Sequence, residues 1–337
     1  MKQLQGAPWL LAHRSMLKPN QPMKVSLLGQ DYVLWQDRHS KISALPNACP
    51  HMGAMLSEGW CVTRSGGSSA TPSESASRIV CPFHALEFNS LGCTVLPGSN
   101  KQTKSLLQPL ELVIQGDFIW SYGGYEPKIP IPSIMNEIAA EYEFIGVTGE
   151  CSIPTDLLSL LLNMHDYNHQ NGTHRELFEI EEVQVKRFID EGLHSHAYLS
   201  QPRKQPTFRD IFRNPAQLAM PKVLEAHLEN FFPFMGLLHG EDKLLSLKEC
   251  HFYLPEADRR SRVFVLMYMR AYSPIAHLLK GNLLKLIDVV IEQDAKILSK
   301  IYANTPQHIK LNNEVGMDWV RRNFESFPAV VEPNLSR

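Results

Sequence analysis

Cys49-Pro50-His51 and Cys81-Pro82-Phe83-His84 are two short Cys/His pairs, each in a turn that follows a β-type run. Two thiolates and two imidazoles in paired loops suit a [2Fe–2S] cluster in which cysteines hold one iron and histidines the other. The alternative is a structural zinc site with two Cys and two His ligands. Zinc fingers usually pair Cys with Cys and His with His along the chain, whereas each loop here carries one of each. The pattern therefore favours the cluster.

Short β-type runs with turn residues between them surround both loops. They cover residues 25–28, 32–35, 41–45, 79–83 and 118–122. This pattern predicts a small all-β domain over residues 1–125. Residues 64–77 (RSGGSSATPSESAS) have low complexity and no apolar anchor, so we expect a surface loop there.

Residues 126–132 (EPKIPIP) mark a linker, because their prolines disfavour both helix and central strand. The pattern of apolar residues changes after this linker. Beyond it, apolar periodicity predicts a domain of mixed helices and strands over residues 133–337. The expected helices cover 133–142, 155–169 and about 274–303, and the expected strands cover 178–188, 193–199, 222–229, 244–254 and 263–272. We therefore expect an α+β chain of two domains.

Residues 163–174 (NMHDYNHQNGTH) hold a second group of metal-binding residue types. On a helix over 155–169, His165 and His169 fall on the apolar face and Asp166 lies beside it. A lone inward histidine would more often be a satisfied core residue. Three histidines and an aspartate so close together indicate a metal site instead. Spacing alone leaves the choice among the histidines open.

The closing helix supplies a carboxylate to this second group. Asp294 shares the apolar stripe of Ile287, Val290, Ile291, Leu298 and Ile301, whereas Glu292 shares a polar face with Asp288, Lys296 and Ser299. A buried carboxylate is costly unless it is paired or binds a metal, so periodicity selects Asp294 over Glu292. A buried ion pair is the alternative. Two histidines and one carboxylate can hold Fe(II) by one face and leave the other open.

Together these motifs resemble those of the Rieske non-heme iron oxygenases. Asp166-x2-His169-x4-His174 is similar to the mononuclear iron motif of that family, and Ile291-Glu292-Gln293-Asp294 to its third-ligand segment. The chain departs from the family at Met52, where Arg usually follows the first His. It also departs at Ala85-Leu86, where Gly and an aromatic residue usually follow the second His, and in the long insertion between the loops.

The resemblance implies a fold, two cofactors and a set of residue roles. An all-β Rieske [2Fe–2S] domain would precede a catalytic domain built of an antiparallel sheet and helices. The implied cluster ligands are Cys49, His51, Cys81 and His84, and the implied ligands of a mononuclear Fe(II) are His169, His174 and Asp294. Asp166 would bridge His169 to the partner subunit's His84 in a homotrimer and carry electrons between subunits. His165 would be a packing residue or would contact a ligand.

The implied function is that of an oxygenase component. It would use O2, with electrons from a separate NAD(P)H-dependent reductase or ferredoxin, because the chain has no flavin or nicotinamide motif. The substrate would be hydroxylated, demethylated or desaturated. Three Phe and one Met in residues 228–238 suggest a small apolar or aromatic substrate, although ordinary core packing explains these residues equally well. Candidate pocket segments are 228–238 and 263–270. The alternative is a Rieske ferredoxin-type electron carrier, which needs only the first 125 residues and leaves the second group unexplained.

Composition limits the other classes of function. The 337 residues carry 33 Lys and Arg against 35 Asp and Glu, a net charge of −2, so the chain has no basic footprint for nucleic acid or an anionic membrane. No apolar run reaches the length of a membrane helix, and no secretion signal stands at the start. Six cysteines are too few for a disulfide scaffold, and we expect Cys61, Cys93, Cys151 and Cys250 to be buried free thiols in a cytoplasmic protein.

Overall fold

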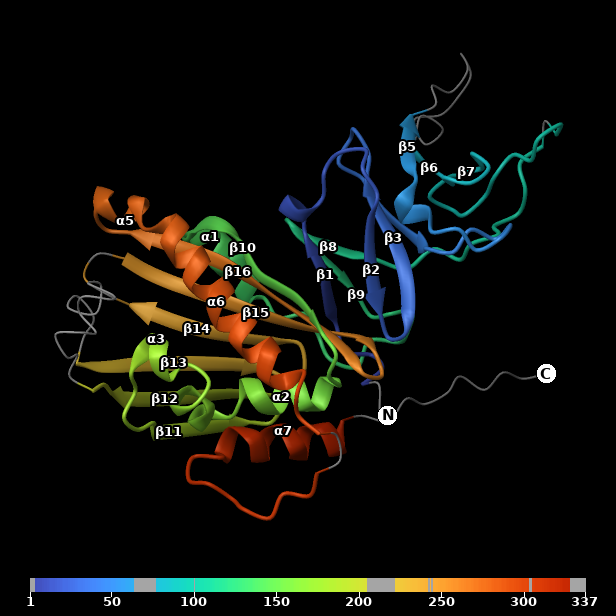
Figure 1. Cartoon of the computed structure of the whole chain (residues 1–337). Helices are drawn as coiled ribbons and strands as arrows, with labels where there is room; N and C mark the ends of the chain where they lie inside the picture. Colours follow the sequence, from blue (N-terminus) through green and yellow to red (C-terminus); the bar gives the residue numbers. More distant parts are fainter. Residues whose placement is uncertain are drawn as a thin grey trace. The chain divides into compact units, whose positions relative to one another are not determined.

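The computed structural model describes residues 4–63, 77–99, 101–204, 222–241, 243, 245–302 and 305–327 (Figure 1). The chain forms two compact units. The first comprises residues 1–131, 254–258 and 329–337, and the second comprises residues 132–253 and 259–328. The serine-rich loop expected at 64–77 lies, apart from Ser77, outside the described residues. Among the described helices, none is both long and apolar enough to cross a membrane.

The first unit is all-β, as the sequence predicts, and holds three antiparallel sheets. Their orders are β1-β9-β8, β2-β3-β4 and β5-β6-β7. The strands are β1 (Trp9–His13), β2 (Met23–Leu27), β3 (Gln30–Gln36), β4 (Ile42–Pro46), β5 (Trp60–Thr63), β6 (Ser77–Val80), β7 (Glu87–Phe88), β8 (Val113–Gln115) and β9 (Phe118–Ser121). All five predicted runs are strands, and short strands such as β7 and β8 were not anticipated.

Buried side chains from these strands build one core around the Cys/His loops. Val33 and Trp35 point inward from β3, and each is at most 1% exposed. Cys49 and Cys81 lie in the same cluster of buried side chains as these two residues. Burying each large apolar side chain there stabilises the fold by about 1.5–3 kcal/mol. Because Cys49 and Cys81 are part of this core, the core fixes the position of both loops.

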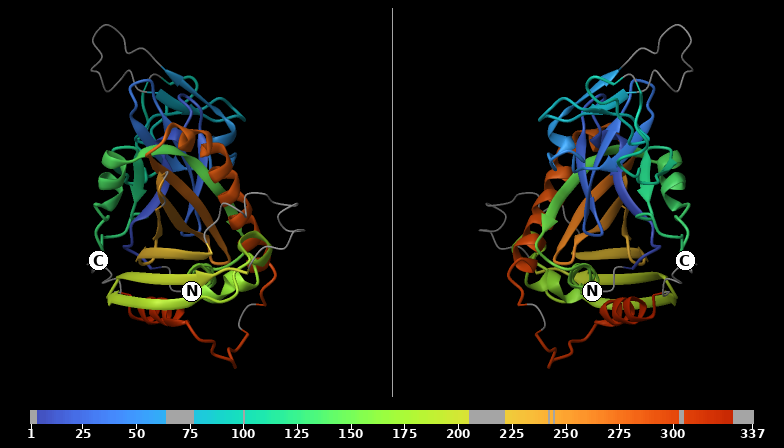
Figure 2. Two further views of the ribbon diagram at one scale, coloured as in Figure 1. Left: turned by 90° about the vertical axis from the view of Figure 1, so that its left-hand side faces the viewer. Right: turned by 90° about the vertical axis from the view of Figure 1, so that its right-hand side faces the viewer.

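The second unit is a seven-stranded sheet with helices, in the order β10-β16-β15-β14-β13-β12-β11. The strands are β10 (Glu143–Ile153), β11 (Gln184–Glu191), β12 (His194–Pro202), β13 (Val223–Phe231), β14 (Met235–Glu241), β15 (Leu245–Ala257) and β16 (Arg260–Ala271). The helices are α1 (Ile134–Glu141), α2 (Leu157–Met164), α3 (Arg175–Phe178), α5 (Pro274–Leu278), α6 (Lys280–Leu298) and α7 (Val315–Ser326). Helix α6 runs across the sheet, and α2 lies beside its C-terminal end (Figures 1 and 2). The predicted sheet with helices is confirmed.

The helix predicted over 155–169 is wrong in its second half. Helix α2 ends at Met164, and a separate 3-10 turn covers Tyr167–Asn171. The side chain of Asp166 accepts a hydrogen bond from the Asn168 N–H at 3.0 Å and so caps the new turn. Because aspartate stabilises a helix start, the chain begins a second turn there instead of extending the first.

The predicted closing helix is also shorter than expected. Helix α6 ends at Leu298, and Ile301, which we expected in the buried stripe, is 55% exposed beyond that end. The strand predicted from residue 178 begins at Gln184, because residues 175–178 form α3. Strands β10 and β14 and helix α7 were not predicted. In β10, Gly146 and Gly149 adopt positive φ angles at register shifts, which removes the alternation that marks a strand.

Candidate functional site

The two Cys/His loops share one backbone geometry. In the first loop the Cys49 N–H donates to Ala54 O (2.9 Å) and the Gly53 N–H donates to Cys49 O (2.8 Å). The second loop repeats both bonds from Cys81 N–H to Leu86 O (2.9 Å) and from Ala85 N–H to Cys81 O (3.0 Å). Each loop is therefore a tight turn that presents its Cys and His in the same way.

Gly53 and Ala85 occupy the same place in the two loops, and both adopt left-handed backbone. Their φ angles are +77° and +54°. Glycine adopts this conformation freely, whereas an L-residue with a Cβ pays about 1–2 kcal/mol. The departure from the family at Ala85 is thus a strained replacement that keeps the turn intact.

The four side chains form two pairs, one of cysteines and one of histidines. Cys49 and Cys81 are buried, whereas His51 and His84 are exposed, with their Nδ1 atoms 3.2 Å apart. Burial and the neighbouring Cys81 raise the pKa of the Cys49 thiol, so a metal there must displace a proton. Buried sulfurs with outward imidazoles fit a cluster held by two cysteines on one iron and two histidines on the other. Met52 and Phe83, which are 66% and 59% exposed, flank the histidines.

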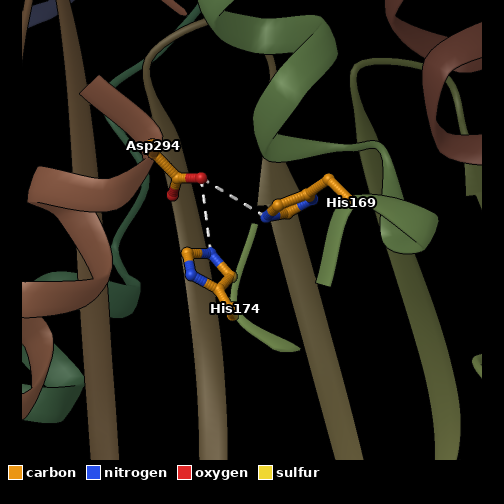
Figure 3. Close-up of side chains that lie close together, drawn as sticks. All are labelled: His169, His174 and Asp294. Atoms are coloured by element: carbon orange, nitrogen blue, oxygen red, sulfur yellow. Dashed lines mark ion pairs between the residues drawn. The ribbon is translucent and has the colours of Figure 1, made fainter. Parts of the chain in front are cut away.

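The second site brings His169, His174 and Asp294 together (Figure 3). Asp294 Oδ1 lies 3.5 Å from His169 Nε2 and 3.3 Å from His174 Nε2. His174 and Asp294 are each 2% exposed. One ligand atom from each residue lies within 4.8 Å of the others. This is the spatial arrangement of a two-histidine, one-carboxylate metal centre.

Protein acceptors occupy the other nitrogen of both imidazoles. His174 Nδ1 donates to Gln293 Oε1 at 2.7 Å, and His169 Nδ1 donates to the backbone carbonyl of Asp166. An imidazole that donates through Nδ1 keeps its lone pair on Nε2. Both lone pairs then face the same carboxylate oxygen of Asp294, an arrangement that requires a cation between them.

Three local structures hold these ligand atoms in place. His169 lies in the 3-10 turn that Asp166 caps, and His174 stands at the start of α3. Asp294 projects from the buried face of α6, whose Asp288 accepts hydrogen bonds from Thr148 Oγ1 and the Gly149 N–H of β10, both at 2.6 Å. The helix is therefore held against the sheet about 1.7 turns before the carboxylate.

The electrostatics of the site also favour a cation. Burial alone would lower the pKa of His174, but Asp294 and Gln293 outweigh it and raise that pKa above its usual value. Burial alone would raise the pKa of Asp294, but His174 and His169 outweigh it and lower that pKa. Among the described residues, neither His174 Nε2 nor Asp294 Oδ1 has a hydrogen-bond partner. Buried polar atoms of this kind fit the binding of a metal ion.

A cavity of about 290 Å³ opens beside these three residues. Its apolar lining comes mainly from α6 and the sheet and includes Met164, Phe178, Leu228, Leu238, Ile287 and Val290. Its polar lining includes Gln201, Asn230, Glu249, His251 and Tyr253. The expected pocket segment 228–238 does contribute to the cavity, although its Phe232 and Phe234 are buried in the core. The segment 263–270 was wrongly expected there, because residues 263–269 are core side chains of β16.

Other candidate residues occupy different places. His165 caps the end of α2, donates through Nδ1 to Leu161 O at 2.7 Å and packs against Trp319. The structure thus separates His165 from His169, although helical spacing had put them on one face. Glu292 is exposed, as predicted. Sequence reasoning missed Gln293 and the polar cavity residues of β13 and β15, because a hydrogen-bond partner has no spacing signature and β14 was not recognised between those strands.

Comparison with known proteins finds similarity in the first unit and over the whole fold. Residues 8–107 match the family of Rieske [2Fe-2S] domains. Cholesterol 7-desaturase of Ciona intestinalis is 29% identical over 143 residues, which are 40% of this chain and 27% of that protein. The 4beta-methylsterol monooxygenase of Methylococcus capsulatus is 26% identical over 165 residues, 46% of this chain and 40% of that one. The chain thus spans less than half the length of these curated relatives.

The likeness to solved structures extends over both units. Dicamba monooxygenase bound to dicamba covers 97% of this chain and 98% of its own, with a TM-score of 0.72 and 19% sequence identity. At that identity the match establishes the fold, and the fold places a Rieske domain before a sheet-rich second domain. Residues 8–107 are a Rieske [2Fe–2S] domain, and the chain as a whole has the fold of dicamba monooxygenase. In a Rieske domain, the Cys/His loops are the expected [2Fe–2S] centre.

Proposed function

We propose that this chain is the oxygenase component of a Rieske-type system that oxidises a small organic substrate with O2. The observation that carries the proposal is the meeting of His169, His174 and Asp294 at the wall of a cavity in the second unit. An electron carrier would need neither that cavity nor a buried carboxylate between two imidazoles. This site therefore favours the oxygenase over the carrier.

The proposed metal ligands follow from the contacts of each side chain. Cys49, Cys81, His51 and His84 hold the [2Fe–2S] cluster of a Rieske domain covering residues 1–125. His169, His174 and Asp294 hold a mononuclear iron in a catalytic domain covering residues 133–337. When bound, the cluster supplies electrons and the iron activates O2. Gln293 and the Asp166 carbonyl orient the two imidazoles so that Nε2 of each faces the metal.

The cavity limits the substrate class. Its volume of about 290 Å³ lies just below the usual range for ligand pockets, which begins at about 300 Å³. Apolar side chains from α6 and the sheet would exclude water around the substrate, and the polar groups of Asn230 and His251 would orient it. We propose a small, largely apolar or aromatic substrate that is hydroxylated, demethylated or desaturated.

The assembly and the electron source complete the proposal. A separate reductase or ferredoxin would deliver electrons at the exposed His51 and His84, where Met52 and Phe83 offer apolar contact area. We propose a cytoplasmic homotrimer in which Asp166 links the two metal centres, because its backbone carbonyl holds His169 and its carboxylate would contact the partner subunit's His84. The Asp166 side chain is half-buried and already caps a turn, so it is held in one place.

Asp294→Ala tests the proposed function. Iron and acid-labile sulfide per chain, the visible spectrum of the cluster and substrate turnover would be measured for both proteins. We expect the variant to keep the cluster spectrum and both sulfides while it loses the mononuclear iron and all turnover. Glu292→Ala, an exposed change on the same helix, is the matched control and should behave as wild type. Turnover by Asp294→Ala would refute the assignment.

A further inference from the structure

The second unit carries another group of histidines, on the face of the sheet that looks away from the cavity. Leu228 and Asn230 of β13 line the cavity, so Glu229 between them points to the opposite face. His196 of β12 pairs directly with Glu229 across the strands and shares that face. His194 lies two residues before His196 on the same strand and therefore on the same side.

The hydrogen bonds of this group fix where its protons lie. Lys248 Nζ donates to His239 Nδ1 (2.7 Å), so His239 carries its own proton on Nε2, which donates to Glu229 Oε2 (2.9 Å). The other oxygen of Glu229 lies 2.9 Å from His194 Nε2 and accepts its proton. His194 Nδ1 is then left with a lone pair, and it faces Glu191 Oε2 at 3.3 Å. A lone pair and a carboxylate that face each other need a cation between them.

His196 adds a second imidazole at the same place. Its Nδ1 lies 3.1 Å from His227 Nε2, and its ring centroid lies 4.6 Å from that of His194. One ligand atom from each of Glu191, His194 and His196 lies within 4.8 Å of the others. When His196 donates to His227 through Nδ1, its Nε2 lone pair is free for a metal. Two imidazoles and a carboxylate at these separations suit a divalent transition metal.

The hairpin that carries these ligands is firmly held. Gly192 forms the turn between Glu191 at the end of β11 and His194 at the start of β12. The carbonyl of Gly192 accepts hydrogen bonds from Trp319 Nε1 (2.8 Å) and Asn323 Nδ2 (3.0 Å), both on α7. The backbone that carries the ligands is thus fixed before a metal arrives, which reduces the entropy cost of binding.

We propose that Glu191, His194 and His196 form a second metal site, which takes a divalent transition metal such as Zn²⁺. Glu229 orients His194 from its other nitrogen, as carboxylates commonly do for metal-bound histidines. The exposed Glu191 leaves the remaining coordination position open to water. This site is independent of the iron site proposed above, since its side chains point away from the cavity.

Equilibrium dialysis of the iron-loaded protein against Zn²⁺, with zinc and iron counted by mass spectrometry, tests this site. Wild type should take up one zinc per chain without losing iron. His196→Gln should bind zinc at least about tenfold more weakly, and Glu229→Gln should lose about 10–100-fold in affinity. His39→Gln, at an exposed histidine of the first unit, is the matched control and should not change binding. Unchanged iron and sulfide contents would show that each variant is folded.

Two further measurements separate this site from the iron site. Asp294→Ala should retain the zinc affinity of wild type, and anomalous scattering at the zinc edge from a crystal soaked in Zn²⁺ should give a peak beside Glu191 and His194. Zinc uptake by His196→Gln equal to that of wild type, or uptake that disappears in Asp294→Ala alone, would overturn the proposal. A proton on His194 would then be the cation between Glu191 and Glu229.

Discussion

Gln293 accepts a hydrogen bond from His174 Nδ1 at 2.7 Å, and the next residue, Asp294, faces Nε2 of the same ring at 3.3 Å. Two neighbouring side chains of α6 therefore hold opposite edges of one imidazole. One fixes its tautomer and orientation, and the other contributes the carboxylate. We expect metal affinity at this site to depend on both.

Gln293→Leu removes the acceptor while preserving side-chain size. Loss of such an orienting partner typically weakens metal binding about 10–100-fold, so we expect iron to dissociate from the variant at correspondingly lower chelator concentration. Iron retention during a chelator titration measures this, with the sulfide content as the internal reference for the cluster. Glu292→Leu, at the exposed neighbour, should retain iron as wild type does. Equal retention by Gln293→Leu would mean that the Gln293 contact does not orient a ligand.

Ala85→Gly should stabilise the first unit. Ala85 adopts a φ of +54°, where a Cβ costs about 1–2 kcal/mol. Glycine removes this strain, but its greater conformational entropy in the unfolded chain offsets part of the gain in stability. We expect a net gain of about 1 kcal/mol, seen as a higher melting temperature of the cluster absorbance. Ala54→Gly in the other loop, where φ is not positive, should instead lower that temperature. A lower melting temperature for Ala85→Gly would show that the second loop is not strained.

Asp166 has two roles that variants can separate. Asp166→Asn keeps a capping side chain, whereas Asp166→Ala loses the cap and about 1 kcal/mol. If the carboxylate carries electrons between subunits, both variants should slow the oxidation of the reduced cluster in a single turnover with substrate and O2. Both should still contain the cluster and the mononuclear iron. A wild-type rate in Asp166→Asn would contradict the bridging role.

The protonation of His165 should make the second unit sensitive to acid. Burial lowers the pKa of His165 to about 4, although its bond to Leu161 O opposes the shift, and the unfolded-state value is 6.5. The unfolded chain therefore binds more protons between these values, so the stability that His165 provides is complete above pH 6.5 and falls as the pH approaches 4. His165→Asn keeps a donor for Leu161 O but does not titrate. Its melting temperature should fall less than that of wild type over this range, and an equal fall would contradict this source of acid sensitivity.

The sequence was informative wherever a motif is local or periodic. The Cys49 and Cys81 loops could be predicted from the local sequence, because the hydrogen bonds that close each loop lie within six residues. Asp294 could be distinguished from Glu292 because, in a regular helix, the spacing of a residue from the apolar positions predicts whether its side chain is buried. His169 was predicted on the helix over 155–169, but it lies in the 3-10 turn that follows α2. Asp166 caps this turn, so the helical periodicity ends before His169. Strand β10 escaped prediction because its glycines interrupt alternation, and the cavity depends on strands that meet only in the folded sheet.

The most direct test of the account is the iron, zinc and acid-labile sulfide content of the anaerobically purified protein, with an EPR spectrum after dithionite reduction. We predict about three irons and two sulfides per chain and a Rieske-type signal, because one [2Fe–2S] cluster and one mononuclear iron are expected. Two irons that do not rise to three on reconstitution with Fe(II) would contradict the catalytic centre. Zinc at the Cys/His loops without sulfide would contradict the [2Fe–2S] cluster and, with it, the proposed oxygenase function.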